Sequence, residues 1–311
     1  MKLSLRWKSN CFIIVIDFEY IQGGGFLAEN ILDSITKQYN SLTRSGKKLA
    51  DYIFANTSST QYMSITSLAE SCGVSEATIT RFCRGLGLSG YNDFKLALAK
   101  CERTNNLGDP SDIPQTINAD DNFDIMCHKL YASNIVSLNE TLDHLEEKTL
   151  DKAVNLLSEA RQVYCFGQGG SMVMAMEAWA RFSTTTSNFI HIEDSHMQTM
   201  AAALASPQDV IFFFSYSGST KDMEEVLQLA KQRKTPIILV THFPKSRAAE
   251  FADIVLQCGY NESPLQSGSI AAKVGQLFLI ECLFYGYCRK NPEVRAAARE
   301  STAQAIAKKL L

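Results

Sequence analysis

The sequence predicts an all-α helix-turn-helix domain, followed by a doubly wound α/β domain with a five-stranded parallel sheet of the flavodoxin-like kind. Three observations lead to this fold class. Residues 64–88 hold two short helical patterns that meet at a glycine. From residue 149 onward, apolar strand-like runs alternate with amphipathic helical patterns. Residues 104–121 are rich in Asn, Asp, Gly and Pro, which is typical of a linker between folded units.

These patterns divide the chain into four segments. Residues 30–104 are expected to form the helix-turn-helix domain, residues 105–121 the linker, and residues 122–311 the α/β domain. Residues 1–29 are expected to form a poorly ordered extension, and whether they belong to the native protein stays open. Their apolar run, Cys11–Ile16, is shorter than the roughly 7–15 residues of a secretory signal core and the ~20 residues of a membrane-spanning helix.

Charge and cysteine usage narrow the class of protein. The chain has 311 residues and a net charge of −3. Residues 1–107 carry 12 Lys+Arg against 9 Asp+Glu, a net of +3, whereas residues 108–311 carry 18 against 24, a net of −6. A mildly basic first part on an acidic body is compatible with a DNA-binding head. The nine cysteines include no C-x-x-C pair, which favours reduced thiols in the cytoplasm, and we expect no metal site and no cofactor.

The first domain is built around the sequence of residues 64–88, SITSLAESCGVSEATITRFCRGLGL. Gly73 can adopt the positive φ of a tight turn between two helices. Ser75 can cap the second helix, because its side chain can accept a hydrogen bond from a free N–H of the first turn. The second helix of such a pair enters the major groove of DNA. Helical periods over 31–42, 49–54 and 92–102 supply the supporting helices, and the apolar contacts expected where the two crossed helices meet are Leu68, Ala69, Val74, Ile79 and Phe82.

Several polar side chains point away from this core on the second helix. Arg81 can make a bidentate contact to guanine, Arg84 suits a phosphate, and Glu76 can accept a hydrogen bond from cytosine. The alternative for either arginine is a solvated helix face. Lys95 and Lys100 on the following helix are interpreted as surface charge. The candidate DNA contacts are Ser75, Glu76, Thr80, Arg81 and Arg84.

The second domain opens with a helix over 123–145, whose apolar residues lie on one stripe. The strands that follow are nearly continuous apolar runs, which is typical of a parallel sheet covered by helices on both faces. The expected strands are Gln162–Phe166, Asn188–Ile192, Asp209–Phe214, Pro236–Thr241 and Asp253–Gln257. The expected helices span 149–160, 171–183, 195–205, 220–233, 245–251 and 269–288.

Two of these strands end in loops rich in glycine and serine, Gly167–Ser171 (GQGGS) and Ser215–Thr220 (SYSGST). Ligands of open α/β sheets bind at the carboxyl ends of strands, where free N–H groups and helix N-termini favour an anion. Neither loop has the Gly-Lys-Ser/Thr of a Walker A motif, and Met172 breaks the dinucleotide pattern G-x-G-x-x-G. An ordinary tight turn is the alternative for each loop taken alone. The candidate ligand contacts in the loops are Gly169, Ser171, Ser215, Ser217, Ser219 and Thr220.

The two loops resemble the phosphate-binding segments of the sugar isomerase (SIS) domain. Residues 74–99, VSEATITRFCRGLGLSGYNDFKLALA, resemble the N-terminal motif of RpiR/MurR-type transcription regulators. Together the resemblance covers the chain from residue 30 onward. It implies that a phosphorylated sugar binds in a SIS-like domain and alters DNA binding. It also implies homodimers or homotetramers joined mainly through that domain, and a symmetric dimer fits a palindromic DNA operator.

The resemblance also carries over to individual positions. Ser171, Ser215, Ser217 and Thr220 match phosphate-contacting positions, and Glu262 matches a carboxylate near the sugar hydroxyls. His196 and Gln198 match a segment that follows the second strand of the family. Ala272 departs from the family, which often has serine just before a basic residue, here Lys273. That departure leaves the identity of the sugar open.

A sugar-phosphate isomerase or lyase is the second interpretation. Such an enzyme needs a positioned base to move a proton between carbons. No pair of candidate bases has a spacing that demands catalysis, and an isomerase has no need of a helix-turn-helix. We therefore expect a cytoplasmic regulator without enzyme activity or membrane contact, whose partners are double-stranded DNA and a phosphorylated sugar. The candidate bases of the alternative are Glu193, Asp194, His196, Glu224, Glu225 and Glu262.

Overall fold

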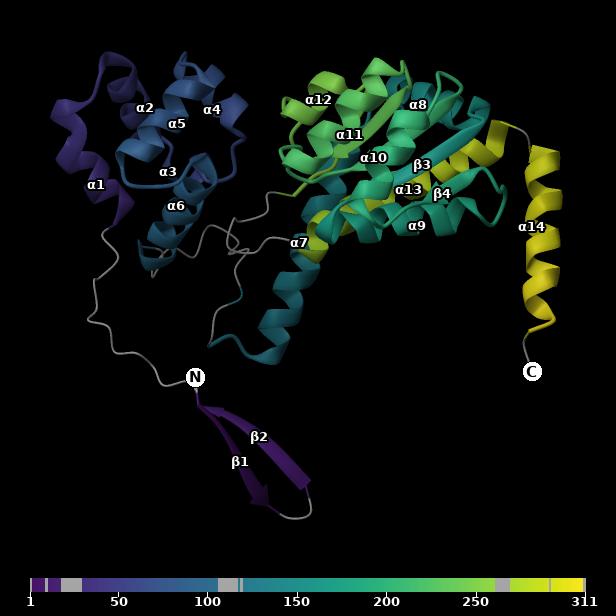
Figure 1. The fold of residues 1–311 in the computed structure, drawn as a ribbon, viewed down its shortest axis with the longest axis horizontal. Helices are drawn as coiled ribbons and strands as arrows, with labels where there is room; N and C mark the ends of the chain where they lie inside the picture. The colour runs from purple at the N-terminus through teal and green to yellow at the C-terminus, as the bar shows by residue number, and fades with distance from the viewer. Residues whose placement is uncertain are drawn as a thin grey trace.

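The computed structural model of the chain describes residues 2–8, 11–17, 30–105, 117, 120–260, 269–290 and 292–309. Within these residues, the helices between residues 31 and 105 form one domain, and a parallel sheet flanked by helices forms the second (Figure 1). The predicted linker lies almost entirely outside the described residues. The expected two-domain order, all-α followed by α/β, is confirmed.

The N-terminal domain packs six helices around one apolar core. Its centre is formed by Ile35, Leu49, Ile53, Leu68 and Ile79, whose side chains are fully buried. The core joins the two helices of the predicted motif to the supporting helices on either side. The helices are α1 (Ile31–Gln38), α2 (Arg44–Ala55), α3 (Thr57–Thr60), α4 (Ile65–Cys72), α5 (Glu76–Gly85) and α6 (Tyr91–Asn105).

The turn between α4 and α5 has the local geometry that the sequence predicts. Gly73 ends α4 with a φ of +61°, which a side chain would strain. Ser75 caps α5, because its Oγ accepts a hydrogen bond from the Thr78 N–H at 3.2 Å. On α5, Ile79 and Phe82 are buried, as expected for the face that packs on the rest of the domain.

The second domain contains a five-stranded sheet in the order β4-β3-β5-β6-β7, with every neighbouring pair parallel. The first strand of this sheet, β3, lies inside it; β4 is added on one side of β3, and β5, β6 and β7 follow on the other. The point at which the strand order reverses therefore lies between β3 and β5. In register, Gly167 at the end of β3 pairs with Phe214 at the end of β5. The strands are β3 (Gln162–Gly167), β4 (Phe189–His191), β5 (Asp209–Phe214), β6 (Ile237–Thr241) and β7 (Ile254–Gln257).

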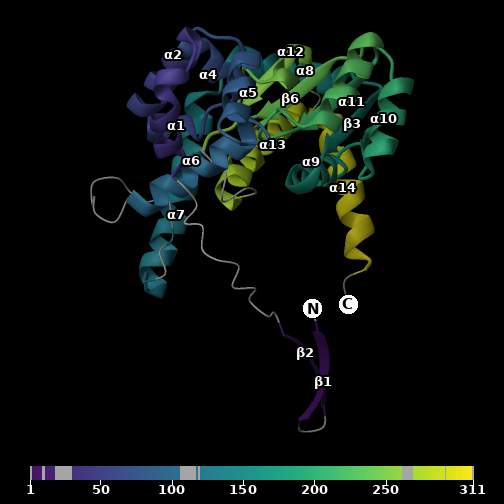
Figure 2. The same cartoon turned by 60° about the vertical axis from the view of Figure 1, so that its left-hand side comes forward.

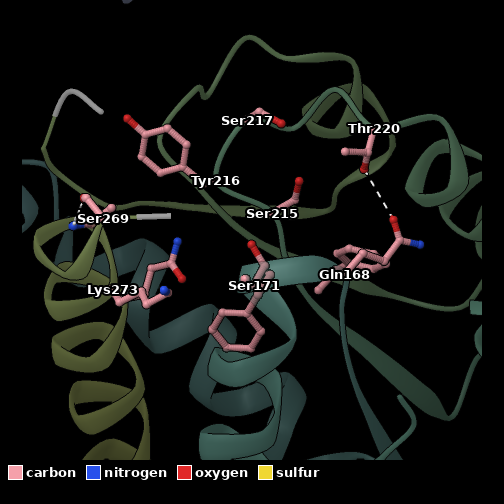
Figure 3. Close-up of a pocket in the computed structure, with 13 residues that line it drawn as sticks. Gln168, Ser171, Ser215, Tyr216, Ser217, Thr220, Ser269 and Lys273 are labelled. Atoms are coloured by element: carbon pink, nitrogen blue, oxygen red, sulfur yellow. Dashed lines mark hydrogen bonds between the residues drawn. The ribbon is translucent and has the colours of Figure 1, made fainter. Parts of the chain in front are cut away.

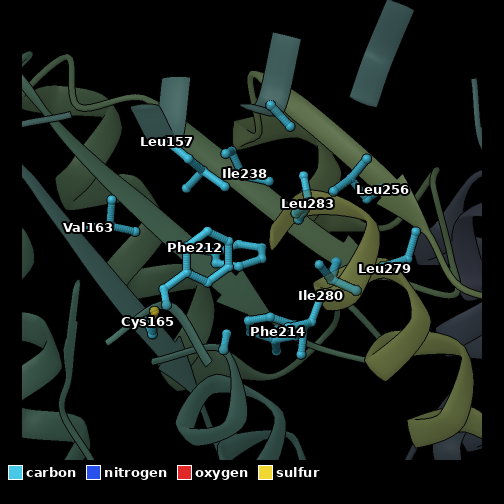
Figure 4. Packing of buried hydrophobic residues seen from close by; sticks show 14 of the residues in the cluster. Leu157, Val163, Cys165, Phe212, Phe214, Ile238, Leu256, Leu279, Ile280 and Leu283 are labelled. Carbon is cyan, nitrogen blue, oxygen red and sulfur yellow. The ribbon is translucent and has the colours of Figure 1, made fainter. Parts of the chain in front are cut away.

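Helices cover both faces of this sheet, as the apolar strands predict. Alternation along β5 divides its side chains between two cores. Phe212 and Phe214 join one (Figure 4), and Ile211 and Phe213 join the other. The first face is covered by α8 (Glu147–Glu159), α9 (Met172–Phe182) and α13 (Ile270–Lys290). The second face is covered by α10 (Ser195–Leu204), α11 (Lys221–Gln232) and α12 (Arg247–Phe251).

Helix α7 (Phe123–Asp143) packs differently from the sequence expectation. Its buried positions are Ser137 and Thr141, whereas Phe123 and Leu142 on the predicted apolar stripe are exposed. The reason is a close helix–helix contact: the Ser137 hydroxyl donates to the Ala271 carbonyl at 2.6 Å, and small polar side chains fit where α7 meets α13. Helix α13 has the length and apolar composition of a membrane span, but half of it is buried in the domain core.

A pair of strands and a C-terminal helix lie outside the predicted pattern. Strands β1 (Lys2–Lys8) and β2 (Cys11–Asp17) pair antiparallel in the segment that was expected to have little order. The β-branched run of β2 favours a strand, a signal that the sequence analysis set aside. At the other end, α14 (Pro292–Ala307) extends beyond the sheet domain (Figure 1). Neither element contributes to the sites described below.

Candidate ligand pocket and recognition helix

A cavity of about 190 Å³ opens at the carboxyl ends of β3 and β5, where the order of the sheet reverses (Figure 3). This is the place at which an open α/β sheet binds its ligand. The cavity has room for a small polar metabolite, because the protein's own side chains do not fill it. It is lined by Gln168, Gly170, Ser171, Phe213, Phe214, Ser215, Tyr216, Ser217, Thr220, Ser269, Ala272, Lys273 and Gln276.

The loop after β3 brings one hydroxyl to the cavity. A short 3-10 turn, Gly169–Ser171, leads into α9, so Ser171 lies at the N-terminal end of that helix. Gln168 lines the same wall, and its Oε1 accepts a hydrogen bond from the Thr220 hydroxyl at 3.5 Å (Figure 3). This contact joins the first loop to the second across the mouth of the cavity.

The loop after β5 brings three more hydroxyls, from Ser215, Ser217 and Thr220. Its tight curvature depends on Gly218, which has a φ of +58° and whose N–H donates to the Ser215 Oγ at 3.2 Å. A Cβ at Gly218 would overlap the side chain of Ser246, which lies directly behind the loop. The loop therefore has a fixed shape that is set partly by the segment after β6.

Helix α13 forms the third wall of the cavity, of which the family resemblance indicated Ala272 and Lys273 but not Ser269 and Gln276. Ser269, Ala272, Lys273 and Gln276 face the loops at helical spacing, although 48 or more residues separate them from the second loop. The signal was available, because a lysine and a glutamine stand out in the first two turns of a helix that is otherwise apolar there. Only the fold shows that this face of the helix meets the two loops.

The electrostatics of the cavity favour an anionic ligand. Among the lining residues that the structure describes, Lys273 carries the formal charge, and the N-termini of α9 and α11 add the positive ends of two helix dipoles. Two buried amide atoms, Gln168 Nε2 and Gln276 Oε1, have no hydrogen-bond partner among the described residues. A buried polar atom without a partner is costly, so both atoms favour a polar ligand that supplies one.

The structure brings together four of the predicted ligand contacts, Ser171, Ser215, Ser217 and Thr220. Gly169 and Ser219 do not line the cavity, and the Ser219 hydroxyl instead donates to the Ser217 carbonyl at 3.0 Å. Gln198 is buried behind the first loop, where it donates to the Gly167 carbonyl at 3.1 Å, and His196 is exposed outside the cavity. Glu262 lies outside the described residues.

Apart from Glu262, which lies outside the described residues, the candidate bases of the enzyme interpretation do not line the cavity. Asp194 caps α10, where it accepts a hydrogen bond from the Met197 N–H at 2.9 Å. Glu224 pairs with Arg247 at 2.7 Å, and Glu193 and Glu225 are exposed. Along the described part of the chain, no Asp, Glu or His lines the cavity. The described part of the cavity wall thus offers binding groups without a general base.

The recognition helix α5 presents fewer free side chains than the sequence suggests. Ser75, Arg81 and Arg84 are exposed. Glu76 is half-buried and accepts a hydrogen bond from the Thr66 hydroxyl of α4 at 2.6 Å, while the Thr80 hydroxyl donates to the Glu76 carbonyl at 3.0 Å. The two arginines remain the side chains with the reach for base edges and phosphates.

Lys95 is not the plain surface charge that the sequence analysis assumed. It is half-buried, and its Nζ lies 5.4 Å from the ring centroid of Phe243, which belongs to the second domain. Desolvation by this burial lowers the pKa of Lys95 to about 8. Lys100, by contrast, is exposed as expected.

Comparison with known proteins places both domains in described families. The helix-turn-helix domain of the rpiR family matches residues 29–104, and the SIS domain matches residues 156–285. A Haemophilus influenzae protein, named an uncharacterized HTH-type transcriptional regulator, is 31% identical over 277 residues, which are 89% of this chain and 96% of that protein. The HTH-type transcriptional regulator HexR of Pseudomonas aeruginosa is 31% identical over 213 residues, which are 68% of this chain and 73% of HexR.

A solved structure extends the similarity to the whole arrangement. The NanR protein of Vibrio vulnificus, in complex with ManNAc-6P, superposes with a TM-score of 0.80 at 28% identity, covering 90% of this chain and 99% of NanR. The order of the two domains, the helix-turn-helix geometry and the five-stranded sheet all agree with these matches. The chain belongs to the RpiR family of helix-turn-helix transcriptional regulators that carry a SIS domain.

Proposed function

We propose that this protein is a DNA-binding transcription regulator whose operator binding is controlled by a phosphorylated sugar held in the SIS domain. The observation that carries the proposal is the wall of the cavity. Four serine and threonine hydroxyls of the two loops, one lysine and two helix N-termini converge on it, and no described carboxylate or imidazole joins them. This combination suits a phosphate group, which needs donors and positive charge.

The two ends of the ligand would have different surroundings. The phosphate would lie among Ser171, Ser215, Ser217 and Thr220, with Lys273 as the countercharge. The sugar would then extend toward Gln276, whose free Oε1 requires a donor such as a hydroxyl or an amide N–H. NanR, solved with an N-acetylated hexosamine phosphate, supports a ligand of this class without naming the sugar for this chain.

The rival function, isomerase or lyase, lacks a positioned base in the described cavity wall. We therefore propose that the SIS domain senses a sugar phosphate and does not convert it. The proposal places the protein in the cytoplasm, where both DNA and phosphorylated sugars are found.

We also propose a homodimer or homotetramer that binds a palindromic operator. Exposed apolar side chains on α7 support this, because Phe123 is 78% exposed and Tyr131 and Leu142 are also exposed. A second copy packed on this face would cover them. Two recognition helices related by a twofold axis would then read half-sites about one helical turn apart, ~10 base pairs, or a multiple of that spacing.

Calorimetric titration with matched pairs of ligands tests the sugar-phosphate proposal. ManNAc-6P, glucose 6-phosphate and fructose 6-phosphate are compared with their unphosphorylated sugars. A phosphorylated compound is expected to bind and its unphosphorylated partner to fail, and Lys273→Ala should weaken binding by about 10- to 100-fold. Lys152→Ala on α8, an exposed lysine outside the cavity lining, is the control.

Footprinting on the chain's own promoter region completes the test. Addition of the bound sugar phosphate should change protection of the operator at a constant protein concentration. Product analysis of the same mixtures should detect no isomerised sugar. Turnover by the pure protein would favour the enzyme interpretation, and binding without any change in the footprint would contradict ligand control.

A further inference from the structure

We propose that residues His242–Ser246, the bridging segment, couple occupancy of the cavity to the position of the helix-turn-helix domain. The inference rests on the proposed function and specifies how its site is linked to DNA binding. The bridging segment follows β6 and touches the second ligand loop on one side and the N-terminal domain on the other. Figures 1 and 2 both show the N-terminal helices on the side of the sheet domain that carries α12, the helix that follows this segment. Each of these contacts can be followed residue by residue.

The first contact fixes the bridging segment to the ligand loop. The His242 N–H donates to the Tyr216 carbonyl at 3.1 Å, and the two rings stack at 5.2 Å with an interplanar angle of 6°. Farther along, the Ala248 N–H donates to the Gly218 carbonyl at 3.1 Å, and Ser246 fills the space behind Gly218. A shift of the loop that closes its hydroxyls around a phosphate must therefore displace the bridging segment as well.

The second contact joins the bridging segment to the N-terminal domain. Lys245 Nζ lies 2.6 Å from a carboxylate oxygen of Glu70 on α4. Phe243 packs edge-on against the rings of Tyr216 and His242. The ammonium of Lys95 on α6 lies over the ring of Phe243. An aromatic unit that lines the ligand cavity at one end thus touches a DNA-binding domain at the other.

Both helices reached in this way hold the recognition helix α5. On α4, the Thr66 hydroxyl donates to the Glu76 carboxylate in the first turn of α5 at 2.6 Å. On α6, the ring of Phe94 lies edge-on to Phe82 of α5, with centroids 6.2 Å apart. The domain core is close-packed, so α4 and α6 move with α5 as one body, and a change at the bridging segment reorients the whole reading surface.

The contacts between the bridging segment and the N-terminal domain are weak enough for a switch. The side chains of Lys245 and Glu70 are 62% and 53% exposed, and an ion pair that exposed contributes little stability. Lys95 is desolvated over Phe243, which opposes the charged form and offsets part of the attraction between cation and ring. The docked and released arrangements therefore differ little in free energy, and a ligand with a modest preference can select between them.

A charge-swap cycle on the full-length chain tests whether the ion pair makes the contact. Hydrogen exchange is measured in α4 and in the bridging segment for Lys245→Glu, for Glu70→Lys and for the double variant. Each single change places like charges together and should increase exchange, and the double swap should restore the wild-type pattern. Lys231→Glu, which breaks the exposed Lys231–Asp253 pair at 2.8 Å, is the matched control and should leave α4 unchanged. Equal exchange in all variants would overturn the docking contact.

Addition of inorganic phosphate tests the coupling itself. At a phosphate concentration that saturates the calorimetric titration, exchange in α4 of the wild type should change by about fivefold. Phe243→Ala should still bind phosphate, with an affinity changed by no more than the coupling factor of about fivefold, and should lose this response. If phosphate binds but α4 does not respond in the wild type, the coupling is wrong while the proposed ligand site stands. If neither phosphate nor ManNAc-6P binds the wild type, the proposed function fails, and this inference fails with it.

Discussion

The recognition helix and the ligand pocket are built in opposite ways. The helix-turn-helix comes from one uninterrupted stretch, residues 64–88, in which the turn, the cap and the core contacts lie close together in sequence. The pocket is assembled from 168–171, 215–220 and 269–276, which meet only because β3 and β5 are neighbours in the sheet and α13 crosses their ends. A local motif can be recognised in the sequence almost complete, whereas an assembled site is recognised only in part.

The two regions also differ in whether a single substitution affects binding alone or both binding and stability. The N-terminal domain has its reading groups on an exposed face, so their removal leaves the core intact. The pocket loops follow strands that are buried between two hydrophobic cores, and they are supported by neighbouring loops. Substitutions on the recognition helix should therefore change DNA binding without changing stability. Substitutions in the pocket loops should change ligand binding and stability together.

The largest effect is expected for Gly218→Val, because the pocket loop has no space for a side chain there. A Cβ would overlap Ser246, and the φ of +58° would strain a β-branched residue. The variant should lose ligand binding and about 3 kcal/mol of stability, measured by calorimetry and denaturant unfolding. Gly170→Ala in the other loop meets only ordinary van der Waals contacts and should fold normally. Wild-type stability of Gly218→Val would show that the loop is less constrained than its geometry indicates.

Next in size is Arg81→Ala on the recognition helix, which should lower selective operator binding by about 10- to 100-fold. The thermal midpoint and the ligand affinity should stay at wild-type values, because Arg81 is exposed. Arg84→Ala should instead weaken binding to all sequences and reduce the salt dependence by about one unit of slope. Footprints measured over a salt series distinguish the two. An unchanged operator footprint for Arg81→Ala would mean that another face of α5 reads the bases.

A smaller effect is expected for Ser217→Ala in the pocket. Loss of one hydroxyl should weaken ligand binding by about five- to tenfold, while operator binding without ligand stays unchanged. Ser219→Ala provides the contrast, since that hydroxyl bonds to the Ser217 carbonyl outside the cavity lining. Calorimetric titration of both variants checks the assignment. Equal losses in the two would mean that the ligand reaches beyond the cavity described above.

The smallest effect concerns a buried charge at the start of β5. Burial alone would raise the pKa of Asp209, but hydrogen bonds from Arg161 and Ser206 hold this pKa below its ordinary value of 3.8. The ionised carboxylate of Asp209 therefore stabilises the fold at pH values above its ordinary pKa. This stabilisation is lost as the pH falls through the lowered pKa of the folded state.

Arg161→Ala should remove most of this contribution. We expect its thermal midpoint to lie about 2–4 °C below that of the wild type at pH 7. The difference should close as the pH falls below the ordinary pKa of the carboxyl. Thermal unfolding measured between pH 2 and pH 8 checks the sign, and a difference that widens at low pH would contradict it. Lys231→Ala, which removes an exposed ion pair, should show little difference at any pH.

Much of the fold could be predicted from the sequence because its signals are local. All five strands of the parallel sheet begin and end within one residue of the expected limits, since apolar runs and turn residues mark their ends. The hydroxyl loops were also visible, and four of their predicted contacts line the cavity. The α7 interface was not predicted, because its buried residues, Ser137 and Thr141, are polar and owe their burial to the close approach of α13.

The sequence by itself determined the helix-turn-helix, the alternation of strands and helices, and the two loops at strand ends, because each depends on neighbours a few residues away. Only the tertiary structure decided that Lys273 and Gln276 complete the pocket, and that Lys95 lies over Phe243 and not in solvent. Those placements depend on which face of a helix meets a surface formed by distant parts of the chain. Side-chain periodicity marks a face as apolar or polar, but it does not say which partner that face will contact.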